Sequence, residues 1–322
     1  MYSGKRIGAD VVISSARKYV ISIIGLGQLG SAIGDQLTGC EVVGWDPMIC
    51  GNSDIKSDTL YDSIKDANTI FIVVPSDCFE GVVREIIAEY AEHKRWHDAT
   101  KVNIISFTKG FCNGRLPIEV LQRELPFNPV GVISGPMLSA ELYKERTSAM
   151  LASSNMDHFK VSEINCRMNN IQLYHTTDTV GVTLCGIMKN VYAVGMGMLA
   201  GCGYGENMKA CLATRALYEM EYFAGCTIST YAGVGDFLTT CYSSKSRNYT
   251  YGYNIATGGD TSGIMAEGVK NLNGLKQYSP VILPLVNAID ESLQTSNTAP
   301  LLDDLQKYNG LGLRGMEPIQ YP

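Results

Sequence analysis

The sequence predicts an α/β protein in which an N-terminal doubly wound parallel sheet is followed by an all-helical C-terminal domain. Strand-like and helix-like patterns alternate up to about residue 178, whereas long helical patterns dominate from residue 179 onward. With 322 residues the chain is too long for one ordinary core, and its 45% hydrophobic content supports globular folding throughout. We therefore expect two domains, residues 19–178 and 179–322, preceded by a loosely attached extension at residues 1–18.

The first strand and helix carry a dinucleotide-binding pattern. The apolar run Tyr19 to Ile24 leads directly into Gly25-Leu26-Gly27-Gln28-Leu29-Gly30. The first glycine permits a tight turn, the second lets the backbone approach a pyrophosphate, and the third lets the helix lie close to the strand. The N-terminus of that helix then faces the phosphates. We therefore expect a Rossmann-type domain that holds a dinucleotide through Gly25, Gly27, Gln28, Leu29 and Gly30, rather than a purely structural glycine turn.

An acidic residue at the end of the second strand indicates which dinucleotide binds. The apolar run Glu41 to Trp45 is followed by Asp46, which lies 21 positions after Gly25. A carboxylate there accepts hydrogen bonds from the adenosine ribose and repels a 2′-phosphate. The expected cofactor is therefore NAD rather than NADP.

The rest of the sheet is predicted from further apolar, β-rich runs. These lie at Thr69 to Val74, Val102 to Ser106, Val130 to Ile133, Ser148 to Leu151 and Ile171 to Tyr174. Helical patterns lie between them, for example Phe79 to Tyr90 and Ile118 to Glu124. Pro75 is expected to end the third strand and to border the cofactor, because ligands bind beyond the carboxyl ends of such strands.

The stretch Val180 to Ala200 is apolar and long enough to cross a bilayer. Lys189 and Asn190 stand at its middle, where a charge would be costly in lipid, and four glycines in the stretch suit close helix packing. We expect the central helix of the second domain and no membrane span.

Composition excludes several partners and sets the compartment. The net charge is −6 and no run of lysine and arginine exceeds two residues, so no nucleic-acid or membrane-surface footprint is present. The ten cysteines occur without a CxxC pair, which predicts reduced, mostly buried thiols and a cytoplasmic protein. His93 and His97 form an HxxxH pair, but with no third ligand in view an exposed helical face is favoured over zinc, and no metal is expected.

Four short segments place polar groups among apolar residues or glycines. They are Ser106 to Gly110 with Lys109, then Lys189-Asn190, then Gly233 to Thr240 with Asp236, and finally Ser246-Arg247-Asn248. Because they come from both predicted domains, convergence on one interdomain cleft is the simplest interpretation.

The chemistry of these side chains suits acid-base catalysis and anion binding. Burial in an apolar helix lowers the pKa of a lysine, which makes Lys189 a usable proton donor or acceptor that Asp236 could orient. Arg247 with Asn248 offers a fork donor and an amide for an oxyanion or phosphate. The alternatives are a snorkelling Lys189, a helix-capping Asp236 and a solvated loop around Arg247.

In order and spacing, these segments resemble NAD-dependent glycerol-3-phosphate dehydrogenases over roughly residues 20–268. The densest similarity runs from Met188-Lys189-Asn190-Val191 through Gly205-Glu206-Asn207, Glu219-Met220 and residues 233–241 to Ser246-Arg247-Asn248. The resemblance implies a Rossmann domain, a helical substrate-binding and catalytic domain, and interconversion of dihydroxyacetone phosphate and glycerol 3-phosphate with a nicotinamide cofactor.

The resemblance also implies roles for individual residues. It makes Lys189 the proton carrier, Lys109 the group that polarises the substrate and also borders the cofactor, and Asp236 their companion. The remaining positions line the substrate or the cofactor. For the substrate these are Gly135, Asn190, Thr240, Ser246, Arg247 and Asn248, and for the cofactor Pro75, Ser139, Arg247 and Glu267.

The sequence departs from the family pattern at several positions. Met137 stands where a small polar residue is usual, Ser139 replaces an alanine, and Asp46 stands where bacterial members commonly carry arginine. Two rivals follow: a dehydrogenase for another small phosphorylated or phosphonate ketone, favoured by Met137, and a non-catalytic NAD-binding regulator. A non-catalytic regulator would not need to keep the polar side chains of all four segments, and their presence together argues against it. The partner is expected to be a small phosphorylated substrate, and a homodimer is left open.

Overall fold

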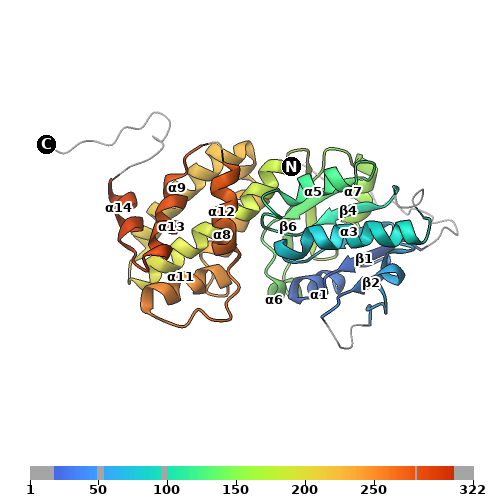
Figure 1. Cartoon of the computed structure of the whole chain (residues 1–322), viewed down its shortest axis with the longest axis horizontal. Helices are drawn as coiled ribbons and strands as arrows, with labels where there is room; N and C mark the ends of the chain where they lie inside the picture. The colour runs from blue at the N-terminus through green and yellow to red at the C-terminus, as the bar shows by residue number, and fades with distance from the viewer. Residues whose placement is uncertain (1–17, 49–53, 96–99, 280, 308–322) are drawn as a thin grey trace, which may run out of the picture.

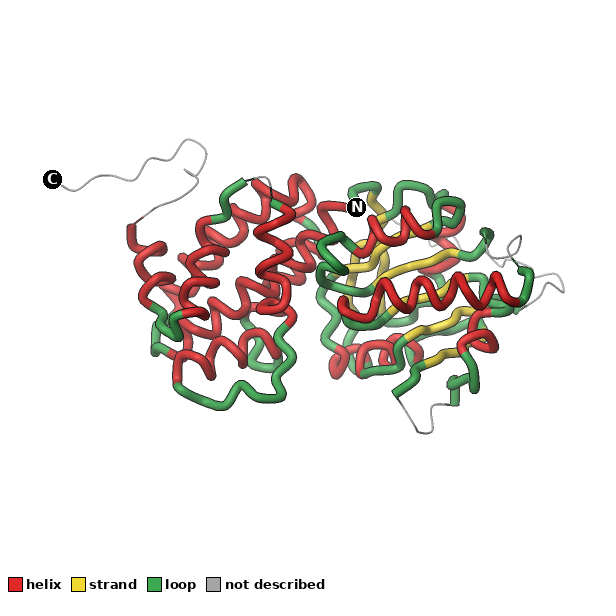
Figure 2. The backbone as a smooth tube through the Cα atoms, viewed as in Figure 1, coloured by secondary structure: helices red, strands yellow, loops and turns green. Residues whose placement is uncertain are grey.

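The computed structural model describes residues 18–48, 54–95, 100–279 and 281–307, so the predicted extension at residues 1–18 lies almost entirely outside the described residues. A sheet region is followed by a helical region, and Figure 1 shows the two side by side, the first in blue to green and the second in yellow to red. The tube view in Figure 2 shows that the second region contains helices and loops only. The predicted order of an α/β region and a helical region is confirmed.

All seven predicted strands are present in one sheet with the order β2-β1-β3-β4-β5-β6-β7. The strands are β1 (Val20–Ile24), β2 (Glu41–Trp45), β3 (Thr69–Ile72), β4 (Asn103–Ser106), β5 (Val130–Ser134), β6 (Thr147–Ala152) and β7 (Ile171–Thr176). The strand order reverses between β1 and β3, which is where ligands bind in doubly wound sheets. The third strand ends at Ile72 rather than at Pro75, and Pro75 precedes the first turn of the next helix.

The predicted doubly wound sheet is confirmed as mostly parallel, with one antiparallel pairing that the sequence analysis did not predict. Strand β6 pairs antiparallel with β5 and parallel with β7, whereas β1 to β5 are parallel to one another. The β5 to β6 connection contains only the four-residue helix α6 (Ser139–Leu142), and a parallel pairing needs a longer crossover, usually a full helix. The amino ends of β6 and β7 therefore lie at the same sheet edge as the carboxyl ends of β1 to β5.

Helices cover both faces of the sheet, and each face of the sheet packs against its helices in a separate apolar cluster. One face carries α1 (Gln28–Gly34), α6 and α7 (His158–Asn165), and the other carries α2 (Leu60–Ile64), α3 (Ser76–Glu92) and α5 (Pro117–Glu124). The cluster on the α3 side continues without interruption into the helical region. The two regions therefore share one core.

The helical region is built around α8 (Thr179–Gly201), whose residues Val182 to Leu199 are all buried. Among the described residues it is the one helix apolar and long enough to cross a membrane, and it instead forms the centre of the protein interior. Around it lie α9 (Glu206–Ala224), η1 (Gly225–Ser229), η2 (Tyr231–Gly235), α10 (Asp236–Cys241), α11 (Arg247–Thr257), α12 (Glu267–Tyr278), α13 (Pro284–Gln294) and α14 (Ala299–Lys307). The prediction of a central buried helix is confirmed.

Glycines allow α8 to approach its neighbours closely. A side chain at Gly197 would collide with the carbonyl oxygen of Tyr249, and one at Gly252 would collide with that of Val194. These glycines bring the backbones of α8 and α11 into direct contact. The crossing fixes the helix that carries Lys189.

A buried carboxylate ties α13 to this core. Glu219 in α9 accepts hydrogen bonds from the backbone N–H groups of Leu285 and Val286, at 2.5 and 3.4 Å, and from the Tyr192 hydroxyl at 2.9 Å. It thereby satisfies N–H groups in the first turn of α13 that have no partner within that helix. Burial raises the pKa of Glu219 to about 7.

Candidate active site

Two lysines, one from each region, converge on a single carboxylate. Asp236 is the first residue of α10, and its Oδ2 accepts a hydrogen bond from Lys109 Nζ at 2.8 Å. The other oxygen, Oδ1, accepts from Lys189 Nζ, which also donates to Thr240 Oγ1 at 2.9 Å. Thr240 Oγ1 in turn donates to the Asp236 carbonyl oxygen at 2.7 Å. Four residues from three predicted polar segments therefore meet, which we call the Asp236 cluster.

Burial decides the charge state of this cluster. The side chains of Lys189 and Asp236 are 5% and 2% exposed, whereas that of Lys109 is 19% exposed. Burial lowers the pKa of Lys189 to about 7, with the Asp236 carboxylate opposing the shift and the charge of Lys109 adding to it. Burial alone would raise the pKa of Asp236, but the two ammonium groups outweigh it and hold that pKa below its usual value. The pKa of Lys189 therefore lies near neutral pH, and its side chain is buried rather than extended to the surface.

Lys109 reaches the cluster from the segment after β4. Besides Asp236 it contacts the carbonyl oxygen of Gly135, at 3.3 Å. Gly135 follows β5, and a Cβ there would lie only 2.8 Å from the Cα of Ala149. On the opposite side, a Cβ at Gly186 in α8 would lie 3.5 Å from Lys109 Cγ. Because Gly186 has no side chain, α8 leaves room for the aliphatic part of Lys109, whereas Gly135 allows close packing against β6.

Ser134 also contacts the Asp236 cluster, although the sequence analysis did not predict this residue. It is the last residue of β5, is 3% exposed, and its hydroxyl donates to Asp236 Oδ2 at 3.3 Å. The available signal was its place at a strand end beside Gly135, the same kind of position that identified Lys109. Ser134 gives the carboxylate a third side-chain donor.

Asn190 and Asn248 are brought together, but their side chains bind each other. Asn248 Nδ2 donates to Asn190 Oδ1 at 3.0 Å, and Asn248 Oδ1 accepts from the Gly268 backbone N–H at 2.8 Å. Both amides are buried. The Asn248 side chain therefore joins α8, α11 and α12, a role that the resemblance did not indicate.

Arg247 is exposed at the N-terminus of α11 and forms no hydrogen bond or ion pair with any residue that the structure describes. Ser246 precedes it, and its side chain accepts from the Tyr249 backbone N–H at 3.4 Å as the helix cap. A guanidinium without a protein partner, beside a capped helix N-terminus, can bind an anionic group by donating hydrogen bonds to it. Two residues earlier, Lys245 forms a 2.7 Å ion pair with Glu141 of α6, which links the two regions.

Glu267 lies beside the residues that follow β3. Its Oε2 accepts from Ser76 Oγ at 3.3 Å, and Ser76 directly follows Pro75. Burial raises the pKa of Glu267. Ser76 was not among the predicted residues, and a hydroxyl at the first position of a helix after proline is the sequence signal for it.

The glycine loop has the geometry that a pyrophosphate requires. Gly25 has a φ of +100°, and a side chain at Gly30 would collide with the Gly25 carbonyl oxygen, so both positions need glycine. A Cβ at Gly27, by contrast, would meet nothing within 4 Å, so this face of the loop is open. Asp46 accepts from the Leu26 backbone N–H at 2.8 Å, which holds the carboxylate against the loop. The residues present therefore fit a dinucleotide.

The structure explains one departure from the family pattern, Met137, and gives no reason for another, Ser139. Met137 is 8% exposed and packs in the apolar cluster of the sheet region, so it acts in packing and gives no reason to expect another substrate. Ser139 is the first residue of α6 and is partly buried, and nothing in its surroundings explains the serine.

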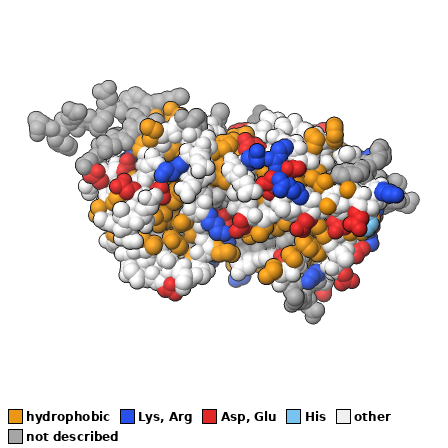
Figure 3. All heavy atoms as spheres, in the orientation of Figure 1, with side chains coloured by type: hydrophobic (Ala, Val, Ile, Leu, Met, Phe, Trp, Pro, Cys, Tyr) orange, Lys and Arg blue, Asp and Glu red, His pale blue; other side chains and the backbone are white. Residues whose placement is uncertain are grey.

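The described residues contain no group of three or more His, Cys, Asp or Glu side chains that could hold a metal ion. His93 follows α3 and stacks on Tyr61 with ring centroids 3.4 Å apart. His97 lies outside the described residues. On the face drawn in Figure 3, acidic and basic side chains are interspersed.

Comparison with known proteins follows the same division of the chain. A family model described as the N-terminus of NAD-dependent glycerol-3-phosphate dehydrogenase matches residues 52–160, and the corresponding C-terminus model matches residues 178–300. Glycerol-3-phosphate dehydrogenase (NAD(P)+) of Pseudomonas putida is 32% identical over 318 residues, which cover 86% of this chain and 91% of the relative. The chain belongs to the NAD-dependent glycerol-3-phosphate dehydrogenase family.

Further relatives agree with this assignment. Glycerol-3-phosphate dehydrogenase (NAD(P)+) of Teredinibacter turnerae is 34% identical over 260 residues, covering 75% of this chain and 74% of the relative. The crystal structure of glycerol-3-phosphate dehydrogenase from Coxiella burnetii superposes with a TM-score of 0.76 at 28% identity, covering 90% of this chain and 98% of that one. The family is one of nicotinamide-dependent oxidoreductases that act on a CH–OH group, and the predicted family is confirmed.

Proposed function

We propose that the protein reduces dihydroxyacetone phosphate to glycerol 3-phosphate with NADH and catalyses the reverse oxidation with NAD. The observation that carries this proposal is the Asp236 cluster, in which a buried lysine with a pKa of about 7 and a second, more exposed lysine share one carboxylate. Reduction of a carbonyl needs a proton at the oxygen as charge develops there, and both groups serve that step. In this assignment residues 19–178 bind the cofactor and residues 179–322 hold most of the substrate contacts.

The proposed roles follow from the positions of the side chains. Lys189 donates its proton to the oxygen on substrate C2 during reduction, and its neutral form takes the hydroxyl proton in the reverse direction. Burial favours the neutral amine that is left after donation. Lys109, whose side chain is more exposed and which also donates to Asp236, stabilises the oxyanion that develops on the substrate. Asp236 and Thr240 orient Lys189 between these two states.

The substrate phosphate is assigned to the N-terminus of α11. Arg247 offers an exposed guanidinium, and the first turn of α11, which begins at Arg247, offers backbone N–H groups. Asn248 therefore contributes through its backbone, because its side chain is engaged with Asn190 and Gly268. Asn190, which directly follows Lys189, and Thr240, which accepts from Lys189, are assigned to the substrate side of the site.

The cofactor is assigned to the carboxyl ends of β1 to β4. Gly25 to Gly30 would hold the pyrophosphate and Asp46 the adenosine ribose. Pro75, Lys109, Ser139, Arg247 and Glu267 would lie nearer the other half of the dinucleotide. A bound nicotinamide supplies or accepts the hydride.

The deciding experiment measures NADH oxidation at neutral pH with dihydroxyacetone phosphate and, in parallel, with unphosphorylated dihydroxyacetone and with a phosphonate ketone of similar size. Turnover should be fastest with dihydroxyacetone phosphate. Preference for the phosphonate would support the rival substrate, and no turnover with any ketone would support a non-catalytic regulator. Light scattering of the same preparation measures whether the protein is a homodimer.

A cytoplasmic location is part of the proposal. The eight cysteines whose state the structure describes are free thiols, which are typical of a reducing compartment. Four of them are exposed and three are buried, so the prediction of mostly buried thiols is wrong for these residues. Fractionation of cells that produce the full-length chain tests it.

A further inference from the structure

One face of α12 lies against the sheet region. Several residues of this helix, spaced so that they share one face, contact residues that follow β3, β4 or both. They are Glu267, which accepts from Ser76, Lys270, which forms a 3.2 Å ion pair with Asp77, Asn271, which accepts from the Phe111 backbone N–H at 2.8 Å, and Tyr278, whose ring centroid lies 5.4 Å from that of Phe111. Helix α12 therefore contacts the segment that carries Lys109.

Asn271 holds the chain two residues after Lys109. It is 2% exposed, its Oδ1 accepts from the Phe111 backbone N–H, and its Nδ2 donates to the Glu267 carbonyl oxygen at 2.8 Å. A flipped carboxamide would lose both hydrogen bonds, so together they fix the position of the side-chain oxygen. That oxygen therefore sets where the chain after Lys109 lies.

The residues on either side of Lys109 have little room to move. A Cβ at Gly110 would lie 3.0 Å from Asn271 Oδ1 and only 2.6 Å from a hydroxyl at the start of α3. On the other side of Lys109, Thr108 Oγ1 donates to the carbonyl oxygen of Val74 at 2.8 Å. The backbone before Lys109 is thus fixed by the sheet region, and the backbone after it is fixed by α12.

The same helix also contacts the backbone beside Lys189. Figure 1 shows α12 next to α8. Gly268 lies about one helical turn before Asn271, and a Cβ there would lie 2.2 Å from the carbonyl oxygen of Asn190, which directly follows Lys189. One turn of α12 therefore connects the backbone next to Lys189 with the backbone next to Lys109, and the spacing of the two lysines depends on it.

We propose that Asn271 is a positioning residue, which holds Lys109 at Asp236 through the Phe111 N–H and so sets the spacing of the two lysines. This inference rests on the proposed function, in which both lysines act at one substrate oxygen. Without the carboxamide, the Phe111 N–H loses its partner, and the segment after β4 is no longer held against α12. Lys109 then contacts Asp236 less closely, while Lys189 stays in place within α8.

A displacement of Lys109 changes the proton equilibrium of Lys189. Among the described residues, the titratable groups that face Lys189 are Asp236 and the Cys241 thiol of α10 and Lys109 of the segment after β4. Burial is the main cause of the lowered pKa of Lys189, the charge of Lys109 adds to it, and that of Asp236 opposes it. When Lys109 withdraws, the pKa of Lys189 therefore rises.

The first test measures the surroundings of Lys109 without turnover. The full-length protein is treated with a trace of acetic anhydride at neutral pH, and mass spectrometry compares acetylation of Lys109 with that of the exposed Lys144 as an internal reference. In Asn271→Ala, Lys109 should react at least about threefold faster, relative to Lys144, than in the wild type, because the ion pair that shields its amine is weakened.

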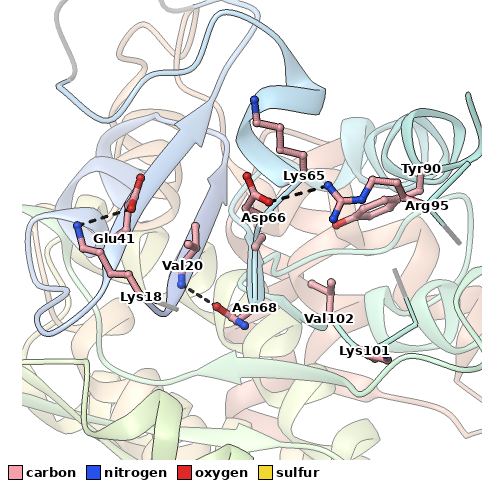
Figure 4. Close-up of a pocket in the computed structure, with 11 residues that line it drawn as sticks. Lys18, Val20, Glu41, Lys65, Asp66, Asn68, Tyr90, Arg95, Lys101 and Val102 are labelled. Carbon is pink, nitrogen blue, oxygen red and sulfur yellow. Dashed lines mark hydrogen bonds and ion pairs between the residues drawn. The ribbon is translucent and has the colours of Figure 1, made fainter. Parts of the chain in front are cut away.

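Two further variants control this test. Asn271→Asp keeps an oxygen of the same shape for the Phe111 N–H, so Lys109 should react within about twofold of the wild type. Asn68→Ala removes a carboxamide that accepts from the Val20 backbone N–H, also at 2.8 Å, but beside the cavity at the amino ends of the strands in Figure 4, and Lys109 should be unaffected. Unchanged reactivity in Asn271→Ala, or an equal increase in either control variant, overturns the proposal.

The second test is kinetic and separates positioning from a purely structural role. Asn271→Ala should lower kcat for reduction about tenfold at neutral pH, because displacement of a group that acts on the substrate is costly. The pH at which reduction declines should move upward by at least about half a unit. The KM for dihydroxyacetone phosphate should change less than about threefold, because the phosphate contact at Arg247 is untouched.

A variant that is merely less stable would lose activity at an unchanged pH midpoint, and that outcome contradicts the proposal. Asn68→Ala should keep the wild-type kcat and midpoint. Failure of turnover in the wild type would refute the proposed function, while acetylation of Lys109 would still decide the role of Asn271.

Discussion

The sheet region and the helical region contribute to the Asp236 cluster in different ways. The sheet region supplies Lys109, Ser134 and Gly135 at or just beyond strand ends, and the Lys109 side chain stays 19% exposed. The helical region supplies Lys189 from the middle of α8 and Asp236 from the start of α10, both almost fully buried. The lysine whose pKa is lowered therefore lies inside an apolar helix, whereas the lysine from the sheet region retains contact with water.

Removing the buried lysine, Lys189, should have the largest effect on turnover. Lys189→Ala is expected to lower turnover by about two to four orders of magnitude, the loss typical of a positioned acid or base, while NADH binding stays near wild type. Steady-state kinetics and NADH fluorescence titration measure the two quantities. Lys189→Met, which fills the same space, should be equally impaired. More than about a tenth of wild-type turnover in either variant would exclude Lys189 as the proton carrier.

The exposed Arg247 should affect binding rather than chemistry. Arg247→Ala is expected to raise the KM for dihydroxyacetone phosphate about 10- to 100-fold, because a charged hydrogen bond to phosphate contributes about 1.5 to 3 kcal/mol. The KM for neutral dihydroxyacetone should barely change. Lys245→Ala, which removes a nearby cation already paired with Glu141, is the control and should stay within twofold. Equal losses on both substrates would show that Arg247 does not recognise phosphate.

The pKa of the buried lysine predicts a pH profile with a definite sign. Reduction needs the protonated form of Lys189, so its rate should fall about tenfold per pH unit above a pKa of about 7. Oxidation of glycerol 3-phosphate needs the neutral amine and should instead rise through the same pH. Initial rates in both directions, measured in buffers of constant ionic strength, test this. Profiles that rise or fall together would mean that another group controls the proton.

At the far end of the cofactor site, Asp46 should set cofactor choice. Asp46→Ser is expected to narrow the preference for NADH over NADPH about fivefold, since one ribose hydrogen bond of about 1 kcal/mol is lost and repulsion of a 2′-phosphate is removed. The ratio of kcat/KM with the two cofactors is the measurement. A wild-type enzyme that uses both equally would contradict the role of Asp46.

The smallest effect is expected for the unpredicted Ser134. Ser134→Ala removes one hydroxyl donor from Asp236. Because one such hydrogen bond contributes about 1 kcal/mol or less, kcat should fall about two- to fivefold. With Asp236 less satisfied, its attraction for Lys189 grows, and the pH midpoint should move upward. Ser22→Ala is the matched control, because Ser22 is equally buried but its hydroxyl has no partner among the described residues. An unchanged midpoint in Ser134→Ala would reduce Ser134 to a packing residue.

Much of this arrangement follows from the sequence because it is encoded locally. Alternation of apolar runs locates the strands, the glycine loop identifies the first turn, and a lysine within an apolar helix is conspicuous on its own. The direction of β6 is not local, since an apolar run is the same whichever way the strand points. The pairing of Asn248 with Asn190, 58 residues away, and the aim of Ser134 at Asp236 depend on tertiary packing. For that reason Ser134 was missed and the side chain of Asn248 was assigned to the substrate.

The sharing of Asp236 by two lysines has a consequence for folding. When both ammonium groups are protonated, the buried cluster carries one more positive charge than negative, and such an excess in a poorly solvated place destabilises the native state. Loss of the proton from Lys189 relieves that excess, so the stability of the native state should rise as the pH increases from below the pKa of about 7 toward the ordinary lysine value. The Asp236 cluster is therefore also a destabilising element of the native fold. Sequence changes that neutralise it would yield a sturdier protein at the expense of its chemistry.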